Sequence, residues 1–139
     1  MSASTQSMVI LCADDDQEDQ MLTEDALREA HLVNDLRFVN DGEELMEYLQ
    51  RRGDYADPAS SPRPGLILLD LNMPRKDGRE ALQEIKADAA LRTIPVLVLS
   101  TSRAQADVLQ TYNLGVAGFI AKPVSFSGLV EVMTTIGKY

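Results

Sequence analysis

The sequence predicts a doubly wound α/β fold, in which helices cover both faces of a parallel β-sheet. Apolar segments of strand length alternate with amphipathic segments of helix length along the 139 residues. Most of these apolar segments are continuous rather than alternating, which is typical of strands buried on both faces. Regular alternation of strand and helix indicates a parallel sheet with helical crossover connections.

Five segments are predicted as strands. The first, at residues 8–13, is apolar throughout, whereas the segment at 36–39 alternates and indicates a weaker strand at an edge. The other three are GLILL at 65–69, PVLVL at 95–99 and GFIA at 118–121. We expect a five-stranded sheet in the order 2-1-3-4-5, which puts the first strand beside the third.

Five helices are predicted from apolar residues spaced three and four positions apart. Asp16 is the expected N-cap of the first helix, at 17–31. Its apolar stripe is expected to consist of Met21, Leu22, Ala26 and Leu27. The other helices are expected at 43–52, 79–88, 104–115 and 127–137. The connection at 51–64 holds three prolines, which discourage helix and strand, so we expect an ordered or semi-ordered surface loop.

Composition narrows the class of protein. The formal net charge of −9 argues against direct binding to nucleic acid, and no apolar stretch approaches the length of a membrane span. Residues 1–7 lack the features of a signal peptide and are expected to form a disordered tail. The single cysteine, Cys12, lies in an apolar run and fits a core position in a reducing compartment. We therefore expect one domain at 8–139 with a cytoplasmic location.

Polar residues stand at the end of four predicted strands. Asp14 and Asp15 follow the first strand, Asp70 the third, Ser100 the fourth and Lys122 the fifth. Ligands of such sheets bind outside the carboxyl ends of the strands, where the strand order reverses. The three aspartates should converge there, and they repel one another unless a cation joins them. Mg²⁺ prefers oxygen ligands of this kind, so the sequence predicts a magnesium site.

Asp70 differs from the other two aspartates because it stands alone on its strand, opposite a lysine and a hydroxyl. A carboxylate beside Mg²⁺ and Lys122 can attack phosphorus and hold an aspartyl phosphate, and the Ser100 hydroxyl can donate to a phosphoryl oxygen. Each of these residues alone is compatible with a helix cap or a turn. Their combination predicts a phosphoryl site.

The motifs ILCADDD, LILLDLNMPRKDGRE, IPVLVLSTS and GFIAKPV resemble the receiver domain of bacterial two-component response regulators. Thirty positions separate Asp70 from Ser100 and twenty-two separate Ser100 from Lys122, which is the spacing of that family. The resemblance covers residues 8–137 and implies a flavodoxin-like fold. It also implies that Asp70 accepts phosphate from a sensor histidine kinase. The protein would then be a signalling module that promotes only its own phosphotransfer and dephosphorylation, and not an enzyme.

The same resemblance implies roles for individual residues. Mg²⁺ would be bound by Asp15, Asp70 and the main-chain carbonyl of Asn72, with Asp14 reaching it through water. Lys122 would pair with the phosphate. Ser100 and Phe119 would form the conformational switch. Ser100 replaces the commoner threonine, and Phe119 replaces tyrosine and so lacks the hydroxyl contact.

Two further expectations concern partners. No output domain is expected after residue 137, so the resemblance is to a stand-alone receiver. The long 51–64 connection, with PRKDGRE and STSRA, resembles regulators that accompany phytochrome-type kinases. Val132 and Tyr139 suggest a homodimer through the face formed by 104–114, 118–121 and the last helix. These two residues are equally compatible with ordinary scattered surface apolars.

Other classes of protein fit the same residues less well. A Mg²⁺-dependent phosphohydrolase that forms an aspartyl phosphate is the alternative, but it resembles D-x-D-x-T, and Asn72 stands where its second aspartate belongs. A flavodoxin-like electron carrier would need a Ser/Thr-rich phosphate loop after the first strand. The P-loop pattern is absent, and Asp19 occupies the glycine position of a calcium-binding EF-hand loop. His31, the only histidine, is interpreted as structural.

Overall fold

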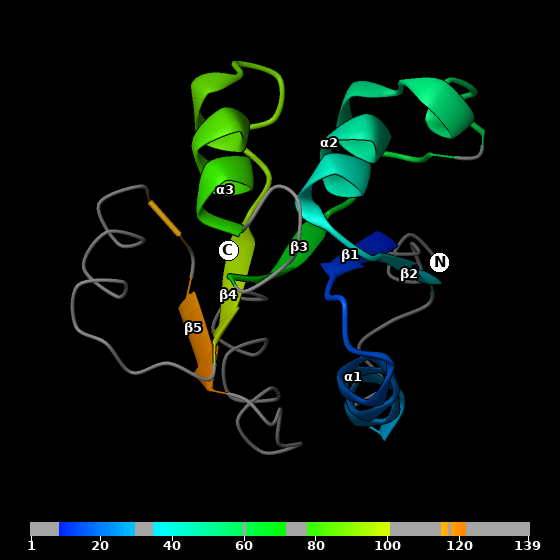
Figure 1. Ribbon diagram of the computed structural model, residues 1–139, viewed down its shortest axis with the longest axis vertical. Helices are drawn as coiled ribbons and strands as arrows, with labels where there is room; N and C mark the ends of the chain where they lie inside the picture. The colour runs from blue at the N-terminus through cyan, green and yellow to red at the C-terminus, as the bar shows by residue number, and fades with distance from the viewer. Residues whose placement is uncertain are drawn as a thin grey trace, which may run out of the picture.

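The computed structural model describes residues 9–29, 35–59, 61–71, 78–100, 115–116 and 118–121. The described strands form one parallel sheet in the order β2-β1-β3-β4-β5 (Figure 1). They are β1 (Val9–Ala13), β2 (Asp35–Val39), β3 (Leu66–Asp70), β4 (Val96–Ser100) and β5 (Gly118–Ala121). The predicted α/β fold with a parallel sheet is confirmed, and β2, the segment with the alternating sequence, lies at an edge.

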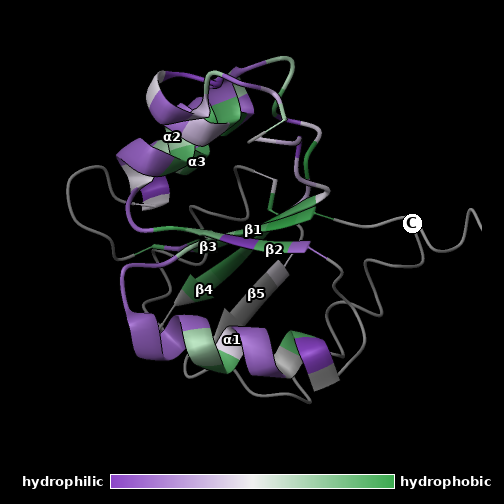
Figure 2. Ribbon diagram, turned by 90° about the vertical axis from the view of Figure 1, so that its right-hand side faces the viewer, coloured by the Kyte–Doolittle hydropathy of each residue, from purple (hydrophilic) through white to green (hydrophobic). Residues whose placement is uncertain are grey.

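Helices cover both faces of this sheet. The described ones are α1 (Gln17–Glu29), α2 (Gly42–Gln50), α3 (Gly78–Ala87) and the short 3₁₀ helix η2 (Gly53–Tyr55). Figure 2 shows α1 on one face and α2 and α3 on the other. The helices predicted at 104–115 and 127–137 lie outside the described residues. None of the helices in the described part is long and apolar enough to span a membrane.

The core has two halves, because successive side chains of a strand point to opposite faces. Leu11 and Ala13 of β1 belong to the larger half, which α2 and α3 complete. Ile10 and Cys12 belong to the smaller half, to which α1 contributes Leu27. Cys12 is fully buried, so its predicted core position is confirmed. Continuous apolar runs therefore arise because each strand packs against helices on both sides.

The predicted apolar stripe of α1 is wrong in part. Leu27 is fully buried, but Met21 is 65% exposed and Leu22 is 46% exposed, whereas Thr23 is fully buried. Residues advance by about 100° around a helix, so Met21 and Leu22 lie about 120° and 140° away from Leu27. Thr23 precedes Leu27 by one turn and shares its face. Two apolar side chains are consequently left on the solvent side of α1.

The described part of the connection at 51–64 is ordered, as predicted, and it also forms a short helix that was not predicted. It contains η2, and the Tyr48 and Tyr55 rings pack with centroids 5.1 Å apart. The Tyr48 hydroxyl donates to the carbonyl of Pro62 at 2.8 Å, and buried Ser61 donates through Oγ to the carbonyl of Tyr55 at 2.9 Å. Prolines excluded a long helix or strand here, but they are compatible with a single 3₁₀ turn held by side-chain hydrogen bonds.

Candidate functional site

The structure brings three of the predicted site residues together at one edge of the sheet. Asp14 and Asp15 follow β1, and Asp70 is the last residue of β3. Because β1 and β3 pair in parallel, with Ala13 opposite Leu69, these carboxylates meet. One oxygen from each lies within 4.8 Å of the others. Asp14 is fully buried and Asp70 is 2% exposed, whereas Asp15 is exposed.

The backbone around Asp14 is fixed by the elements on either side. Its amide donates to the carbonyl of Val39 at 3.1 Å, which ties the tip of β1 to the end of β2. Its Oδ1 accepts from the Asp16 amide at 3.0 Å. The Asp16 carboxylate in turn accepts from the Glu18 amide at 2.8 Å, so the predicted N-cap of α1 is confirmed. One acidic residue thus begins the helix while its neighbours form the cluster.

A second layer of polar residues, which the sequence analysis missed, supports this edge. Gln20 donates through Nε2 to the carbonyl of Asp14 at 2.6 Å and to Oδ1 of Asn40 at 3.3 Å. The Asn40 amide donates to Oε1 of Glu44 at 2.7 Å. The other Glu44 oxygen accepts from the Tyr55 hydroxyl at 2.6 Å. Burial and this carboxylate raise the pKa of Tyr55, so its hydroxyl remains a proton donor. In the sequence alone, nothing distinguished these polar residues from ordinary surface residues.

Gly78, at the start of α3, lies against the end of β3 and was not predicted as a site residue. Its amide donates to the carbonyl of Leu71 at 3.1 Å. A Cβ atom at this position would overlap the Asp70 carbonyl oxygen and would lie 2.6 Å from Cα of Leu71. A glycine directly before a predicted helix was the available signal. Close approach of backbone to backbone explains why no larger residue fits here.

The remaining predicted residues are placed only in part. β4 ends at Ser100, and its neighbour Leu99 is paired with Asp70, so the Ser100 backbone lies at the same edge of the sheet as the acidic cluster. Phe119 lies in β5, paired with Val98. The side chains of Ser100 and Phe119, and the whole of Asn72 and Lys122, lie outside the described residues. Asp14, Asp15 and Asp70 are therefore the candidate residues whose side-chain geometry is described.

The donor set of this cluster fits a hard divalent cation. All three side chains offer carboxylate oxygens, and two of the carboxylates are buried where water solvates them poorly. Like charges held this close repel one another, and a bound cation removes that repulsion. Asp15 is exposed, which leaves the cluster open on one side. An open site of oxygen ligands is the kind in which a divalent ion keeps part of its water shell.

Comparison with known proteins identifies the class to which this fold and site belong. Residues 10–134 match the response regulator receiver domain family. This chain belongs to that family. The match confirms the predicted family, and it argues against the phosphohydrolase and electron-carrier alternatives.

Several relatives are regulators linked to phytochromes. Response regulator Rcp1 from Synechocystis sp. is 40% identical over 131 residues, which cover 94% of this chain and 87% of that protein. The phosphorylated cyanobacterial phytochrome response regulator RcpA is similar with a TM-score of 0.81 and 41% identity, covering 96% of this chain and 93% of the other. The bacteriophytochrome response regulator RtBRR is similar with a TM-score of 0.87 and 36% identity, covering 96% and 80%.

The contact at Gly78 yields a prediction for Gly78→Ala. Alanine favours a helix interior, but the added methyl group must push α3 away from the end of β3. We expect the free energy of unfolding in urea to fall by roughly 1–3 kcal/mol, the usual cost of overpacking. The thermal stabilisation produced by a divalent ion should shrink as well, because Asp70 is displaced.

Gln83→Ala is the matched control, since Gln83 is an exposed residue of the same helix. It should change the free energy of unfolding by no more than about 0.5 kcal/mol. If Gly78→Ala proves as stable as the wild type, the close approach of α3 to Asp70 does not constrain the site.

Proposed function

We propose that this chain is a receiver that accepts a phosphoryl group on Asp70 from a partner sensor histidine kinase, in a reaction that requires Mg²⁺. The observation that carries the proposal is the position of Asp70 at the end of β3, beside Asp14 and Asp15. Membership of the receiver family supports it. The relative RcpA is described as phosphorylated, which supports the same chemistry in this chain.

In the proposed reaction, a carboxylate oxygen of Asp70 forms a bond to phosphorus while the bond from phosphorus to the donor imidazole nitrogen breaks. The imidazole leaves with the bonding electron pair. Lys122 would pair with the phosphoryl oxygens, and the Ser100 hydroxyl would donate to one of them. The carboxylate of Asp70 is held in place by its strand and by Gly78, so little reorganisation is needed.

The proposed metal ligands are Asp15, Asp70 and the main-chain carbonyl of Asn72, with Asp14 contacting the ion through water. When bound, Mg²⁺ would neutralise the negative charge of the phosphoryl group as it approaches three carboxylates. The relative Rcp1 has been solved in a Mn²⁺-bound form, which supports a divalent ion in this family. We propose Mg²⁺ because it suits an open, partly hydrated oxygen site.

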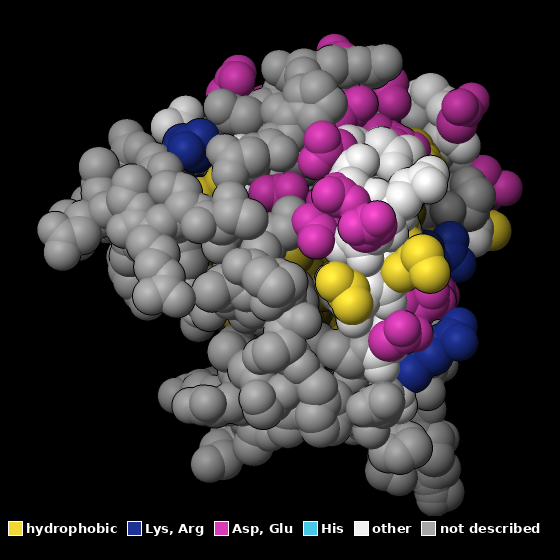
Figure 3. Space-filling view, turned by 60° about the horizontal axis from the view of Figure 1, so that its bottom comes forward, with side chains coloured by type: hydrophobic (Ala, Val, Ile, Leu, Met, Phe, Trp, Pro, Cys, Tyr) yellow, Lys and Arg dark blue, Asp and Glu magenta, His cyan; other side chains and the backbone are white. Residues whose placement is uncertain are grey.

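The partner is proposed to be a phytochrome-type kinase that docks on α1. Met21 and Leu22 are exposed there and adjoin Glu18 and Asp25. Figure 3 shows exposed hydrophobic side chains on this face beside several acidic ones, with basic side chains at one border. An apolar surface ringed by Lys or Arg would complement this patch. The patch lies on α1, whose N-cap, Asp16, is close to the acidic cluster. Several similar proteins are named as phytochrome or bacteriophytochrome response regulators, which supports the type of kinase.

Output is proposed to pass through a surface rather than through nucleic acid, in keeping with the net charge of −9. Ser100 would move toward the phosphoryl group, and Phe119 would fill the space it leaves. The face formed by residues 104–114, β5 and the last helix would then pair with a second copy.

We further propose that residues 8–139 form one receiver domain behind a disordered tail at 1–7, and that the protein acts in the cytoplasm.

The acceptor assignment predicts the outcome of incubation with acetyl phosphate and Mg²⁺. The wild type should gain one phosphoryl group by intact mass spectrometry, and Asp70→Asn should gain none, because an amide is not a nucleophile toward phosphorus. An adduct that survives in Asp70→Asn would move the acceptor elsewhere. Continuous release of phosphate from generic monoesters would favour a hydrolase.

Met21→Ser tests the kinase docking surface when its phosphorylation by acetyl phosphate is compared with its phosphorylation by a histidine kinase. This variant should label normally with acetyl phosphate but should receive phosphate more slowly from a phosphorylated histidine kinase, because only the second route needs the α1 surface. Equal slowing of both routes would mean that the substitution damages the site itself.

Charge repulsion in the cluster predicts opposite effects of Asp15→Asn with and without metal. Loss of one ligand should weaken Mg²⁺ binding by roughly tenfold or more. Loss of one negative charge should raise the melting temperature of the metal-free protein by roughly a few degrees. Calorimetry with and without Mg²⁺ measures both quantities. A lower metal-free melting temperature in the variant would show that the three carboxylates do not destabilise one another.

The switch and the dimer are tested together by analytical ultracentrifugation. Beryllofluoride, which mimics the phosphoryl group, should tighten dimerisation of the wild type, and Ser100→Ala should lose that response. An unchanged dimerisation constant in the wild type would refute control of dimerisation by phosphate. A response of normal size in Ser100→Ala would remove Ser100 from the switch.

A further inference from the structure

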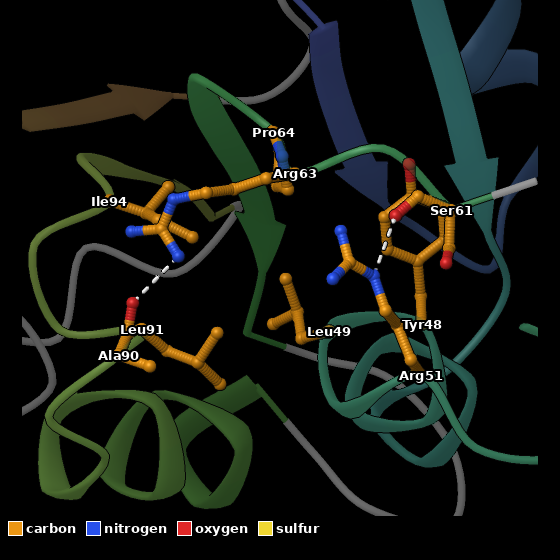
Figure 4. A pocket seen from close by; sticks show the side chains of 9 residues that line it. All are labelled: Tyr48, Leu49, Arg51, Ser61, Arg63, Pro64, Ala90, Leu91 and Ile94. Atoms are coloured by element: carbon orange, nitrogen blue, oxygen red, sulfur yellow. Dashed lines mark hydrogen bonds between the residues drawn. The ribbon is translucent and has the colours of Figure 1, made fainter. Parts of the chain in front are cut away.

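A pocket lies at the end of the sheet opposite the acidic cluster. It has a volume of about 150 Å³ and opens between the end of α2, the connection before β3 and the turn that follows α3. These segments adjoin the amino ends of β3 and β4, whereas Asp14 and Asp70 stand at the carboxyl ends of their strands. Figure 4 shows Arg51 and Arg63 reaching the pocket from opposite sides.

The two arginines have spare hydrogen-bond donors. A guanidinium group carries five N–H donors. Arg51 uses Nε to donate to the carbonyl of Ser61 at 3.3 Å. Arg63 donates to the carbonyl of Ala90 at 2.7 Å and to Oγ1 of Thr93 at 3.1 Å. These bonds fix the direction of both side chains and leave the other donors for a ligand.

Neither guanidinium forms an ion pair with a carboxylate in the described part of the chain. The ion pairs found there join Arg28 to Glu24 and Arg37 to Asp35. Two positive side chains therefore line one pocket in a chain whose net charge is −9. An anion between them would accept charge-assisted hydrogen bonds from both side chains.

The backbone of Arg51 provides independent support. It is the one non-glycine residue with a positive φ among the described residues, at φ 55° and ψ 55°, and it forms the C-cap of α2. Glycine adopts this conformation without strain and is the usual residue at helix ends of this kind, whereas other residues pay an energetic cost. A strained backbone at a residue whose side chain lines a pocket is an indication of function.

The rest of the lining determines the class of anion. Leu49, Pro64, Leu91 and Ile94 supply the apolar part of a lining that is otherwise mostly polar. Inorganic phosphate would leave this surface uncovered, but an acid with a short hydrocarbon part would cover it. The volume is similar to that of a cavity able to hold a benzene molecule.

We propose that this pocket binds a small organic acid, with its carboxylate between Arg51 and Arg63 and its hydrocarbon part against Leu49, Leu91 and Ile94. The site is separate from Asp70 and does not depend on phosphorylation.

Benzoate is the probe, and amide shifts in ¹H–¹⁵N spectra are the measurement. Benzoate should cause saturable shifts at Leu49, Leu91 and Ile94, with an affinity in the millimolar range or tighter. Benzamide, which has the same shape without the charge, should bind roughly tenfold more weakly, and so should inorganic phosphate. Equal binding of benzamide or phosphate, or no saturable shift with benzoate, would overturn the proposal.

Variants separate the pocket from general electrostatic attraction. Arg51→Gln and Arg63→Gln should each weaken benzoate binding by roughly fivefold or more. Arg52→Gln is the matched control, because Arg52 is an exposed neighbour that does not line the pocket. It should bind as the wild type does, and so should Asp70→Asn. A loss in Arg52→Gln equal to that in Arg51→Gln would overturn the proposal.

A second pair of variants guards against misfolding as the cause of lost binding. Arg51→Gly and Arg51→Ala both remove the guanidinium, but only glycine relieves the strain of a positive φ. Arg51→Gly should have the higher melting temperature of the two, and both should lose benzoate binding to the same extent. Retention of normal binding in Arg51→Gly would show that the side chain is not a ligand contact.

Discussion

The parallel pairing of β1 with β3 is the constraint on which the rest of the site depends. It places the ends of two neighbouring strands at one edge of the sheet, so that Asp14, Asp15 and Asp70 lie with oxygens within 4.8 Å of one another. The free energy of bringing three negative charges together must come from the packing of the whole domain. A sheet that is buried on both faces can supply this free energy, because its strands pack against helices on each side.

Two contacts around this edge hold the main chain beside the carboxylates. Gln20 contacts the carbonyl of Asp14, and Gly78 lies against the carbonyl of Asp70. Both contacts fix the main chain from which a carboxylate of the cluster projects. A cation that binds the folded cluster and not the unfolded chain would stabilise the fold, so the stability of the fold and the occupancy of the site would be linked.

Local patterns predicted the strands and the acidic cluster because both depend on short segments of sequence. Continuous apolar runs define buried strands, and parallel strands bring their carboxyl ends together wherever the order places them side by side. Contacts between distant segments could not be predicted in this way. Arg63 donates to the carbonyl of Ala90, twenty-seven positions away, and Met21 is exposed because α1 turns a different stripe toward the sheet. Such features depend on the relative placement of elements, which periodicity within one element does not determine.

The same topology separates charge along the molecule. In a parallel α/β sheet each helix begins near the carboxyl end of the preceding strand, so the positive ends of the helix dipoles gather at the acidic edge. Glu18 and Asp19 occupy the first turn of α1, and Glu43 and Glu44 that of α2. The negative helix ends lie at the opposite edge, where Arg51 caps α2. The helix dipoles favour these side chains at their own edges, carboxylates where the positive ends gather and a guanidinium where a negative end lies. The carboxylates belong to the edge proposed to bind a cation, and Arg51 lines the pocket proposed to bind an anion at the other.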